Sequence, residues 1–319
     1  MSFTLDRVGL IHPGGNAPEQ RALRAVSIDA ARGERLAIIG PSGAGKTSLL
    51  RILASAIRPT EGRVSVLGQN PWQLTGSQLK RLRSRIGFVR QSPPLPPRQR
   101  AITAVIAGRL GEWPWWKSAL SLIYPVDIAG PRDELARLDL ADRLFDRCDR
   151  LSGGQLQRVG VARVLYQRPD LLLADEPISA LDVSVQAQII NLLDELREKT
   201  DTAFLFIAHD LAVVEHISSR ILVMYLGHVV ESGPSRELCD APRHPYSRSL
   251  LSAVPMLERP AGHQRIVLQG DVPSPLAPPA GCPFHPRCPL AVDRCRSERP
   301  QLEGDGEHQT ACFRAGETF

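Results

Sequence analysis

Residues 40 to 47 of this chain read Gly40-Pro41-Ser42-Gly43-Ala44-Gly45-Lys46-Thr47. The short apolar run Leu36–Ile39 precedes them, and the apolar-periodic segment Ser48–Leu53 follows. Strand, glycine loop and helix in that order are the context that a phosphate-binding loop requires. Glycine lets the backbone turn several N–H groups toward one anion, and the helix N-terminus adds the positive end of its dipole. The sequence therefore predicts a site for a nucleoside triphosphate.

The polar residues of this loop have expected tasks. Lys46 would reach the outer phosphates, the Thr47 hydroxyl would hold Mg²⁺, and the backbone from Gly40 to Ser48 would enclose the phosphate chain. The alternative is a glycine-rich turn that fits the pattern by chance. The strand before the loop and the helix after it both favour the phosphate site.

The composition is that of an ordinary globular protein. Of the 319 residues, 43% are hydrophobic and 23% are charged, which allows one large domain with an appendage. We find no signal peptide and no apolar run long enough to span a bilayer, so we expect a cytosolic chain. The net charge of +5 is modest and no dense Lys/Arg run is present, which argues against a nucleic-acid-binding surface.

Strand and helix patterns alternate along most of the chain, which predicts a largely parallel sheet covered by helices on both faces. We expect one domain over 1–235 and a proline-rich, loop-rich extension over 236–319 that is too poor in apolar residues for its own core. Phe3–Val8 has the pattern of an edge strand. Strand signals are absent over about 92–165, where we place a helical subdomain.

Three tryptophans fall within four positions of this helical block, at Trp113, Trp115 and Trp116. Large aromatic side chains are usually mostly buried, so packing inside the subdomain is the favoured interpretation. A docking surface is the alternative.

Two acidic residues follow the buried apolar run Leu171–Ala174. Parallel strands end at one edge of their sheet, where the phosphate loop also lies, so Asp175 and Glu176 are expected beside it. Asp175 would hold Mg²⁺, directly or through water, and Glu176 would polarise an attacking water. His209 follows a second buried strand, Ala203–Ile207, and could contact the γ-phosphate. Alone, such residues are often only exposed acids or a polar cap.

The sequence Ser152-Gly153-Gly154-Gln155 precedes the strongly periodic helix Leu156–Tyr166. A helix N-terminus of this kind is a second anion-binding site. One nucleotide does not need two such sites in one chain. A two-fold dimer would explain both, because each chain could offer its second site to the nucleotide of its partner.

With these motifs in this order, the chain resembles the ATP-hydrolysing subunits of ABC transporters over about positions 1–235. The matching residues are Gly40–Thr47, Gln91, Leu151-Ser152-Gly153-Gly154-Gln155, Asp175-Glu176, Ser179-Ala180-Leu181-Asp182 and His209. The resemblance implies an α/β fold of the ABC-type P-loop NTPase, with a mostly parallel sheet, an antiparallel β subdomain, a helical subdomain and a loop-rich, cysteine-containing tail. It also implies ATP and Mg²⁺ as cofactors.

The same resemblance implies a head-to-tail dimer with two ATP molecules between the chains. The residues that would face the partner's nucleotide are Ser152, Gly153, Gly154, Gln155 and Asp182. Gln91 would bind Mg²⁺ with Thr47 and Asp175, and would link the ion to the helical subdomain, which presses on a membrane partner. Glu176, His209 and Gln91 are the catalytic residues that the resemblance implies.

The position expected to stack on the base departs from the family pattern. Relatives usually carry an aromatic residue near the N-terminus that stacks on adenine, and the corresponding residue here is His12. An imidazole ring can also stack, with less area. Ile178, where many relatives have a small polar residue, is a minor departure.

Two parts of the chain resemble two importer branches. Ala104–Gly111 and the tryptophans after it resemble phosphonate-importer ATPases. Later segments are similar to oligopeptide and dipeptide importer ATPases, namely Asp182–Gln188, His209–Val214, Val223–Gly227, His244–Ser247 and Gly281–Pro289. The longer match favours a peptide importer, with a phosphonate or other small-solute importer as the alternative.

The importer interpretation has two rivals. A soluble ABC ATPase acting on nucleic acid or ribosomes usually carries two cassettes, whereas this chain has one phosphate loop and one signature. Exporters often fuse a membrane span to the ATPase, and we find none. An importer subunit would lie peripherally on the cytoplasmic face of the inner membrane. Its partners would be membrane permease subunits, an external solute-binding protein and a second ATPase subunit, identical or paralogous, with no nucleic acid.

Four of the six cysteines gather in the C-terminal extension, at Cys282, Cys288, Cys295 and Cys312. In a cytosolic chain such a group indicates metal binding rather than disulfides. No Cys-x-x-Cys pair is present, and the wide spacing fits an iron–sulfur cluster at least as well as zinc. Resemblance to peptide-importer ATPases with this tail implies a [4Fe–4S] cluster. Zinc, with His285 as a further candidate ligand, and four unliganded thiols are the alternatives.

Overall fold

The computed structural model describes residues 1–11, 21–91, 93–177, 183–208, 210–253, 266–304 and 306–317. The described strands are β1 (Phe3–Ile11), β2 (Arg21–Ala30), β3 (Arg35–Ile39), β4 (Glu61–Val66), β5 (Ile86–Val89), β6 (Leu171–Asp175), β7 (Ala203–Ile207), β8 (Arg220–Tyr225), β9 (His228–Pro234) and β10 (Gln309–Thr310). The described α-helices are α1 (Lys46–Leu53), α2 (Gly76–Ser84), α3 (Ala101–Ile106), α4 (Trp115–Ile123), α5 (Ala129–Ala136), α6 (Gly153–Gln167), α7 (Val183–Lys199), α8 (Leu211–Ile217), α9 (Ser235–Asp240), α10 (Pro245–Ser252) and α11 (Asp293–Ser297). Single turns of 3₁₀ helix lie at Pro71–Gln73, Ala107–Arg109, Ala141–Arg143, Cys148–Arg150 and His285–Arg287.

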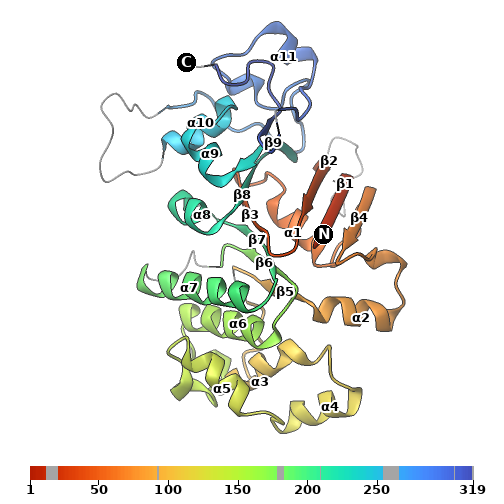
Figure 1. Cartoon of the computed structure of the whole chain (residues 1–319), viewed down its shortest axis with the longest axis vertical. Coiled ribbons are helices and arrows are strands. Elements are labelled where there is room, and N and C mark those ends of the chain that lie inside the picture. The colour runs from red at the N-terminus through yellow and green to blue at the C-terminus, as the bar shows by residue number, and fades with distance from the viewer. Residues whose placement is uncertain are drawn as a thin grey trace.

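Seven of the described strands form one sheet at the centre of the molecule (Figure 1). The strand order is β10-β9-β8-β3-β7-β6-β5, and the strands from β8 to β5 run parallel. β9 and β10 extend the sheet with antiparallel pairing. Every residue of β7 and the first four of β6 are buried, because both faces of the sheet are covered. The predicted mostly parallel sheet is confirmed.

The sheet separates two apolar clusters, because successive side chains of a strand point to opposite faces. In β3, Leu36 and Ile38 belong to the cluster that includes α1 and the strands β1 and β2. Ala37 and Ile39 belong to the cluster that includes α3, α6 and α7. The strand that leads into the phosphate loop is thus fixed from both sides.

A second, antiparallel sheet has the order β2-β1-β4. β1 lies in the middle, because Leu5 pairs with Ile28 of β2 and with Val64 of β4. The prediction of an edge strand over Phe3–Val8 is therefore wrong. Its second neighbour, β4, comes only after the phosphate loop and α1, so no local pattern indicates the pairing.

Helices α3, α4 and α5 lie at one end of the molecule, beyond α6 and α7 (Figure 1). Trp113 is partly buried here, with the Lys117 ammonium 4.4 Å from its ring centre. Trp115 and Trp116 on α4 are 80% and 58% exposed, so the packing interpretation is wrong for these two side chains. No helix in the described ranges is long and apolar enough to cross a membrane.

The C-terminal extension docks on the main sheet instead of forming a core of its own. Strand β10 pairs with β9, with Thr310 opposite Glu231. Phe284 packs edge-on against Tyr225 of β8, with ring centroids 5.4 Å apart. The extension therefore shares the apolar cluster that contains α6 and α7.

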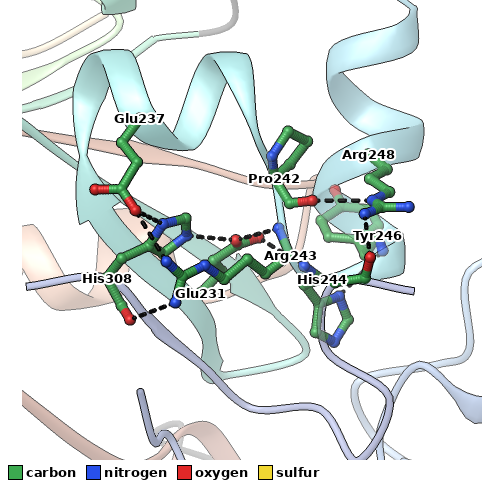
Figure 2. A network of polar contacts seen from close by, with 9 residues as sticks. Glu231, Glu237, Pro242, Arg243, His244, Tyr246, Arg248 and His308 are labelled. Carbon is green, nitrogen blue, oxygen red and sulfur yellow. Dashed lines mark hydrogen bonds and ion pairs between the residues drawn. The ribbon is translucent and has the colours of Figure 1, made fainter. Parts of the chain in front are cut away.

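A buried polar network ties β10 to β9 and α9 (Figure 2). His308 lies between two carboxylates, donating from Nε2 to Glu231 at 2.8 Å and from Nδ1 to Glu237 at 2.9 Å. Glu231 is fully buried and also accepts from the backbone N–H groups of Arg243 at 2.7 Å and His244 at 3.1 Å. Both ring nitrogens of His308 need a proton for these contacts, so the side chain is an imidazolium.

Candidate nucleotide-binding site

The loop between β3 and α1 has the geometry that its glycines predict. Gly40, Gly43 and Gly45 have φ angles of 148°, 78° and 95°, which residues with a side chain disfavour. A Cβ on Gly45 would lie 2.3 Å from the Ala22 carbonyl oxygen, and one on Gly40 would lie 2.2 Å from that of Met224. Only glycine fits at these two turns, and α1 begins directly after the loop.

The Lys46 side chain folds back over this loop. Its Nζ donates to the carbonyl oxygens of Gly40 at 2.7 Å and Pro41 at 2.9 Å, and the side chain is buried. Burial lowers the pKa of Lys46, and the carboxylates of Glu176 and Asp175 oppose that shift. The loop therefore combines a cation with backbone N–H groups at a helix N-terminus, which is the combination that binds phosphate.

The acidic pair lies at the end of β6, close to the loop. Burial raises the pKa of Asp175, and a hydrogen bond donated by the Thr47 hydroxyl opposes the shift. Glu176 has a φ of 48°, and its N–H donates to the Ile207 carbonyl oxygen at 3.1 Å. Gln91, which follows β5, donates from Nε2 to Oε2 of Glu176 at 2.9 Å. Three strand ends thus bring Thr47, Gln91, Asp175 and Glu176 together.

One cavity of about 460 Å³ joins these residues. Its lining consists of Arg21, Ala22, Ser42, Gly43, Ala44, Gly45, Lys46, Thr47, Ser48, Gln91, Asp175, Glu176, Pro275 and Leu276. The volume is within the range usual for a small-molecule site. The cation and the loop N–H groups fit a triphosphate.

The donor set at the mouth of the loop also fits Mg²⁺. The oxygen atoms of Thr47, Asp175 and Gln91 are the hard ligands that this ion prefers. Mg²⁺ commonly takes one or two carboxylates and completes its octahedron with waters and phosphate oxygens. A group of three acidic side chains is therefore not required here.

The second predicted anion site starts α6 and lies apart from this cavity. Ser152 Oγ accepts from the Gln155 N–H at 3.3 Å, and Gln155 Oε1 accepts from the Ser152 N–H at 2.9 Å. Ser152 and Gly153 are exposed. None of the described residues from Ser152 to Gln155 lines the nucleotide cavity of its own chain. The start of α6 is therefore exposed and separate from the phosphate loop of its own chain.

Three predicted site residues, His12, Asp182 and His209, lie outside the described residues, and so do Ile178 and the segment 179–181. His12 was predicted to contact the base, His209 the γ-phosphate and Asp182 the nucleotide of the partner chain.

The cavity includes four residues that sequence reasoning did not select, namely Arg21, Ala22, Pro275 and Leu276. Arg21 and Ala22 open β2, and Arg21 pairs with Glu61 of β4 at 2.7 Å. To find Arg21 and Ala22 from the sequence, one would have to know that β1 pairs with both β2 and β4. Pro275 and Leu276 come from the C-terminal extension, and only its docking in three dimensions brings them to the loop.

The four C-terminal cysteines line a second, small cavity together. All six cysteines of the chain are free thiols. Cys282 and Cys295 are buried, and the Cys282 N–H donates to the Cys295 carbonyl oxygen at 2.9 Å. Burial raises the pKa of Cys282 and Cys312 to about 11 and also raises that of Cys288. In the part of the chain that the structure describes, no three His, Cys, Asp or Glu side chains form a group that could hold a metal ion.

Two family models match the chain. One, described as ABC transporter, covers residues 23–179, and the other, described as oligopeptide/dipeptide transporter C-terminal region, covers residues 230–295. Among solved structures, the dimeric structure of MJ0796, a bacterial ABC transporter cassette, is similar with a TM-score of 0.64 at 28% identity. That similarity covers 73% of this chain and 99% of the cassette.

The relatives include both importer branches. The phosphonates import ATP-binding protein PhnC 1 of Cupriavidus necator is 55% identical over 244 residues, which are 76% of this chain and 85% of the relative. PhnC 2 of Pseudomonas aeruginosa is 48% identical over 288 residues, 90% of this chain and 100% of the relative. A probable peptide ABC transporter ATP-binding protein of Sinorhizobium fredii is 45% identical over 291 residues, 90% of this chain and 80% of the relative.

Fold and site together define a P-loop ATPase with an ABC-type cassette, as predicted. The chain belongs to the ABC transporter ATP-binding family and is the ATP-binding subunit of an importer. Such subunits are ATPases that use ATP and Mg²⁺ and work with membrane permease subunits, and the similar cassette is a dimer. The predicted peptide branch is not confirmed, because relatives of both branches match and the phosphonate proteins are the more similar.

Proposed function

We propose that this chain energises import of phosphonates, the alternative that Ala104–Gly111 and the tryptophans indicated. The observation that carries the proposal is 55% identity across 85% of a phosphonate import ATP-binding protein. A second such protein aligns over 288 residues, which is more than the ATPase domain of 1–235 contains. The C-terminal extension therefore does not by itself indicate a peptide importer.

Import of oligopeptides or dipeptides is the second candidate. The match of residues 230–295 to the peptide transporter C-terminal region favours it, and so does the peptide relative at 45% identity. The identity is lower than that of the phosphonate relatives, and the helical end of the molecule resembles the phosphonate branch.

In the proposed reaction, residues Gly40–Ser48 bind the triphosphate and Lys46 neutralises charge on its outer oxygens. Thr47, Gln91 and Asp175 would hold Mg²⁺, which screens the phosphate charges when bound. The hydroxyl of Thr47, already hydrogen-bonded to Asp175, supports this assignment.

Glu176 is the proposed general base, which orients and deprotonates the attacking water. The 2.9 Å hydrogen bond from Gln91 supports this role, because it orients the Glu176 carboxylate in the cavity that holds the phosphate loop. Gln91 also follows β5 and leads into the helical end, so its position can couple hydrolysis to the membrane partner. His209 is proposed as a γ-phosphate contact.

Completion of each site requires a second ATPase subunit in our proposal. Ser152, Gly153, Gly154, Gln155 and Asp182 of the partner would close over the nucleotide in a head-to-tail dimer. The exposed, well-capped start of α6 supports this arrangement. The partner chain is identical or paralogous, and His12 is the proposed base contact of the same site.

The membrane partner is proposed to dock near the helical end. A groove of about 440 Å³ between α2, β5 and α6 is lined by Lys80, Arg83 and Arg163 among other residues. Helix α4, which begins with the exposed Trp115 and Trp116, lies at the same end of the molecule (Figure 1). The subunit would thus lie on the cytoplasmic face of the inner membrane, serving permease subunits and an external solute-binding protein, without a nucleic-acid partner.

We also propose a [4Fe–4S] cluster held by Cys282, Cys288, Cys295 and Cys312, with zinc as the alternative. The four cysteines line one small cavity, which places them in the same part of the extension. In a cluster each thiolate binds a different iron, so the four sulfurs need not converge on one point, as a single zinc ion would require. Iron and visible absorbance in anaerobically purified protein, lost in Cys282→Ser, would support the cluster. Zinc without iron would favour the alternative.

The function is tested by ATP-dependent uptake through the transporter reconstituted with its own membrane and solute-binding subunits. Labelled alkylphosphonate and labelled dipeptide are offered in separate vesicles. Uptake of the phosphonate alone is expected, and uptake of the dipeptide alone would contradict the proposal and favour the second candidate. The Glu176→Gln transporter controls for leakage, because its uptake of either solute should fall to background.

A further inference from the structure

The nucleotide cavity has one wall that comes from the far end of the sequence. Pro275 and Leu276 line it together with the phosphate loop. A Cβ placed on Gly43 would lie 3.4 Å from Cγ of Pro275, so the proline is in van der Waals range of the loop backbone. Leu276 is 61% exposed, so its side chain presents apolar surface at the edge of the cavity.

The turn that carries these two residues is built to hold its shape. The Ala277 N–H donates to the Ser274 carbonyl oxygen at 3.1 Å, and the Leu276 N–H donates to the Ser274 hydroxyl at 3.2 Å. Proline at the second position of such a four-residue turn presets its backbone angle. The proline and these two hydrogen bonds therefore favour this one conformation of Ser274–Ala277.

Both flanks of this turn are held by contacts with later residues of the extension. Before it, the Gly270 carbonyl oxygen accepts from Nε of Arg287 at 3.1 Å. After it, the Cys282 N–H donates a hydrogen bond to the Cys295 carbonyl oxygen, and Phe284 packs on Tyr225 of β8. The turn is thus held within the extension, which reaches the sheet that carries the phosphate loop through Phe284.

The chemistry of the wall indicates which part of a nucleotide it meets. Polar groups and backbone N–H donors already surround the loop, and these suit the phosphates. Pro275 and Leu276 offer only apolar surface, which gains free energy when it covers an apolar ligand group. The nucleoside, with its flat base, is the part of ATP that has such surface.

We propose that the Pro275–Leu276 turn is a subsite for the nucleoside part of ATP, supplied by the C-terminal extension. The proposal rests on ATP binding at Gly40–Ser48. It makes the extension part of the nucleotide site, in addition to its contacts with β9. Removing the Leu276 side chain should weaken ATP binding while leaving the binding of phosphate groups alone.

The test measures binding of ATP and of inorganic tripolyphosphate, each with Mg²⁺, to the full chain by calorimetry. In Leu276→Ala the Kd for ATP should rise about four- to tenfold, while the Kd for tripolyphosphate stays the same. Val272→Ala is the matched control: this exposed apolar residue of the same segment is not part of the cavity lining, so neither Kd should change. Lys46→Ala should lose both ligands, which tests the phosphate site independently.

Three results would overturn the subsite. Unchanged ATP affinity in both Leu276→Ala and Leu276→Asp would mean that the nucleoside does not touch the turn. Tighter ATP binding would mean that the turn obstructs the cavity. Equal weakening for ATP and tripolyphosphate would mean that the turn acts only through the shape of the loop. If Lys46→Ala also loses tripolyphosphate binding, any of these results would refute the subsite at Pro275–Leu276 but not the phosphate site at Gly40–Ser48.

Discussion

Replacing His308 by alanine should destabilise the protein more than any other single histidine change outside the nucleotide site. The variant keeps Glu231 fully buried but removes the cation that donates to it at 2.8 Å. Removing one partner of a buried ion pair costs about 3–5 kcal/mol. The N–H groups of Arg243 and His244 still donate to Glu231, so we expect the lower end, about 3 kcal/mol.

The assay is thermal unfolding of the full chain with and without the substitution. In domains of roughly this size, each kcal/mol moves Tm by about 2–4 °C, so His308→Ala should lower Tm by roughly 6–12 °C. His216→Ala is the control, because His216 is exposed on α8 and its loss should move Tm by no more than about 1–2 °C. Equal Tm shifts for the two variants would refute the reasoning.

The ion pair of His308 and Glu231 also predicts that the stability of the protein depends on pH. The hydrogen bond to Glu231 raises the pKa of His308 above its ordinary 6.5, although burial opposes the shift. The stabilisation is complete below the pKa of the unfolded chain and is lost as pH rises through the raised pKa. Wild-type Tm should therefore fall more than that of His308→Ala between about pH 6 and about pH 9. Parallel pH profiles would show that His308 is not charged in the folded state.

At acidic pH, Glu231 makes stability depend on pH with the opposite sign. Burial alone would raise the pKa of Glu231, but hydrogen bonds from His308 and from the backbone N–H groups of Arg243 and His244 lower it below the ordinary 4.5. Its contribution is present above the pKa of the unfolded chain and is lost as pH falls through the lowered pKa. The network therefore favours the folded state most strongly between the two ordinary values, where both charges exist.

Three further predictions concern the nucleotide site and the membrane end. Glu176→Gln should abolish ATP hydrolysis while ATP binding persists, because only the proposed base is lost, and turnover near the wild-type rate would contradict that role. Gly45→Ala should abolish ATP binding and lower Tm, since its Cβ would lie 2.3 Å from the Ala22 carbonyl oxygen, whereas Gly76→Ala at the open start of α2 should do neither. Trp115→Ala should leave Tm within about 1 °C, because the side chain is 80% exposed, yet reduce transport, and unchanged uptake would remove it from the docking face.

Local patterns were enough to predict the centre of the site. The glycine loop and the acidic pair after β6 each follow a strand whose buried apolar character is visible in the sequence, whereas Gln91 was selected through the resemblance to ABC ATPases. Parallel strands then end at one edge, so the pattern also predicts that these residues meet. The hydrogen bond from Gln91 to Glu176 is a direct product of that arrangement.

Features that depend on distant pairing were missed or wrong. β1 is a central strand because β4 pairs with its second side, and no local signal distinguishes that from an edge. Trp115 and Trp116 are exposed because a helix at the end of the molecule has few neighbours to cover it. Leu276 enters the site only through the docking of the extension.

The short strand β10 has a consequence for how this protein can be handled. It covers part of β9 at one end of the main sheet, where Ala311 continues the pairing with a 2.8 Å bond from its N–H to the Val230 carbonyl oxygen. A chain cut at the end of the ATPase domain would leave that backbone edge unpaired beside the buried Glu231. Unpaired strand edges recruit strands from other chains and lead to aggregation. By covering this edge of β9, the extension should keep the protein from aggregating. The shortest form of this ATPase that remains monodisperse should therefore include it.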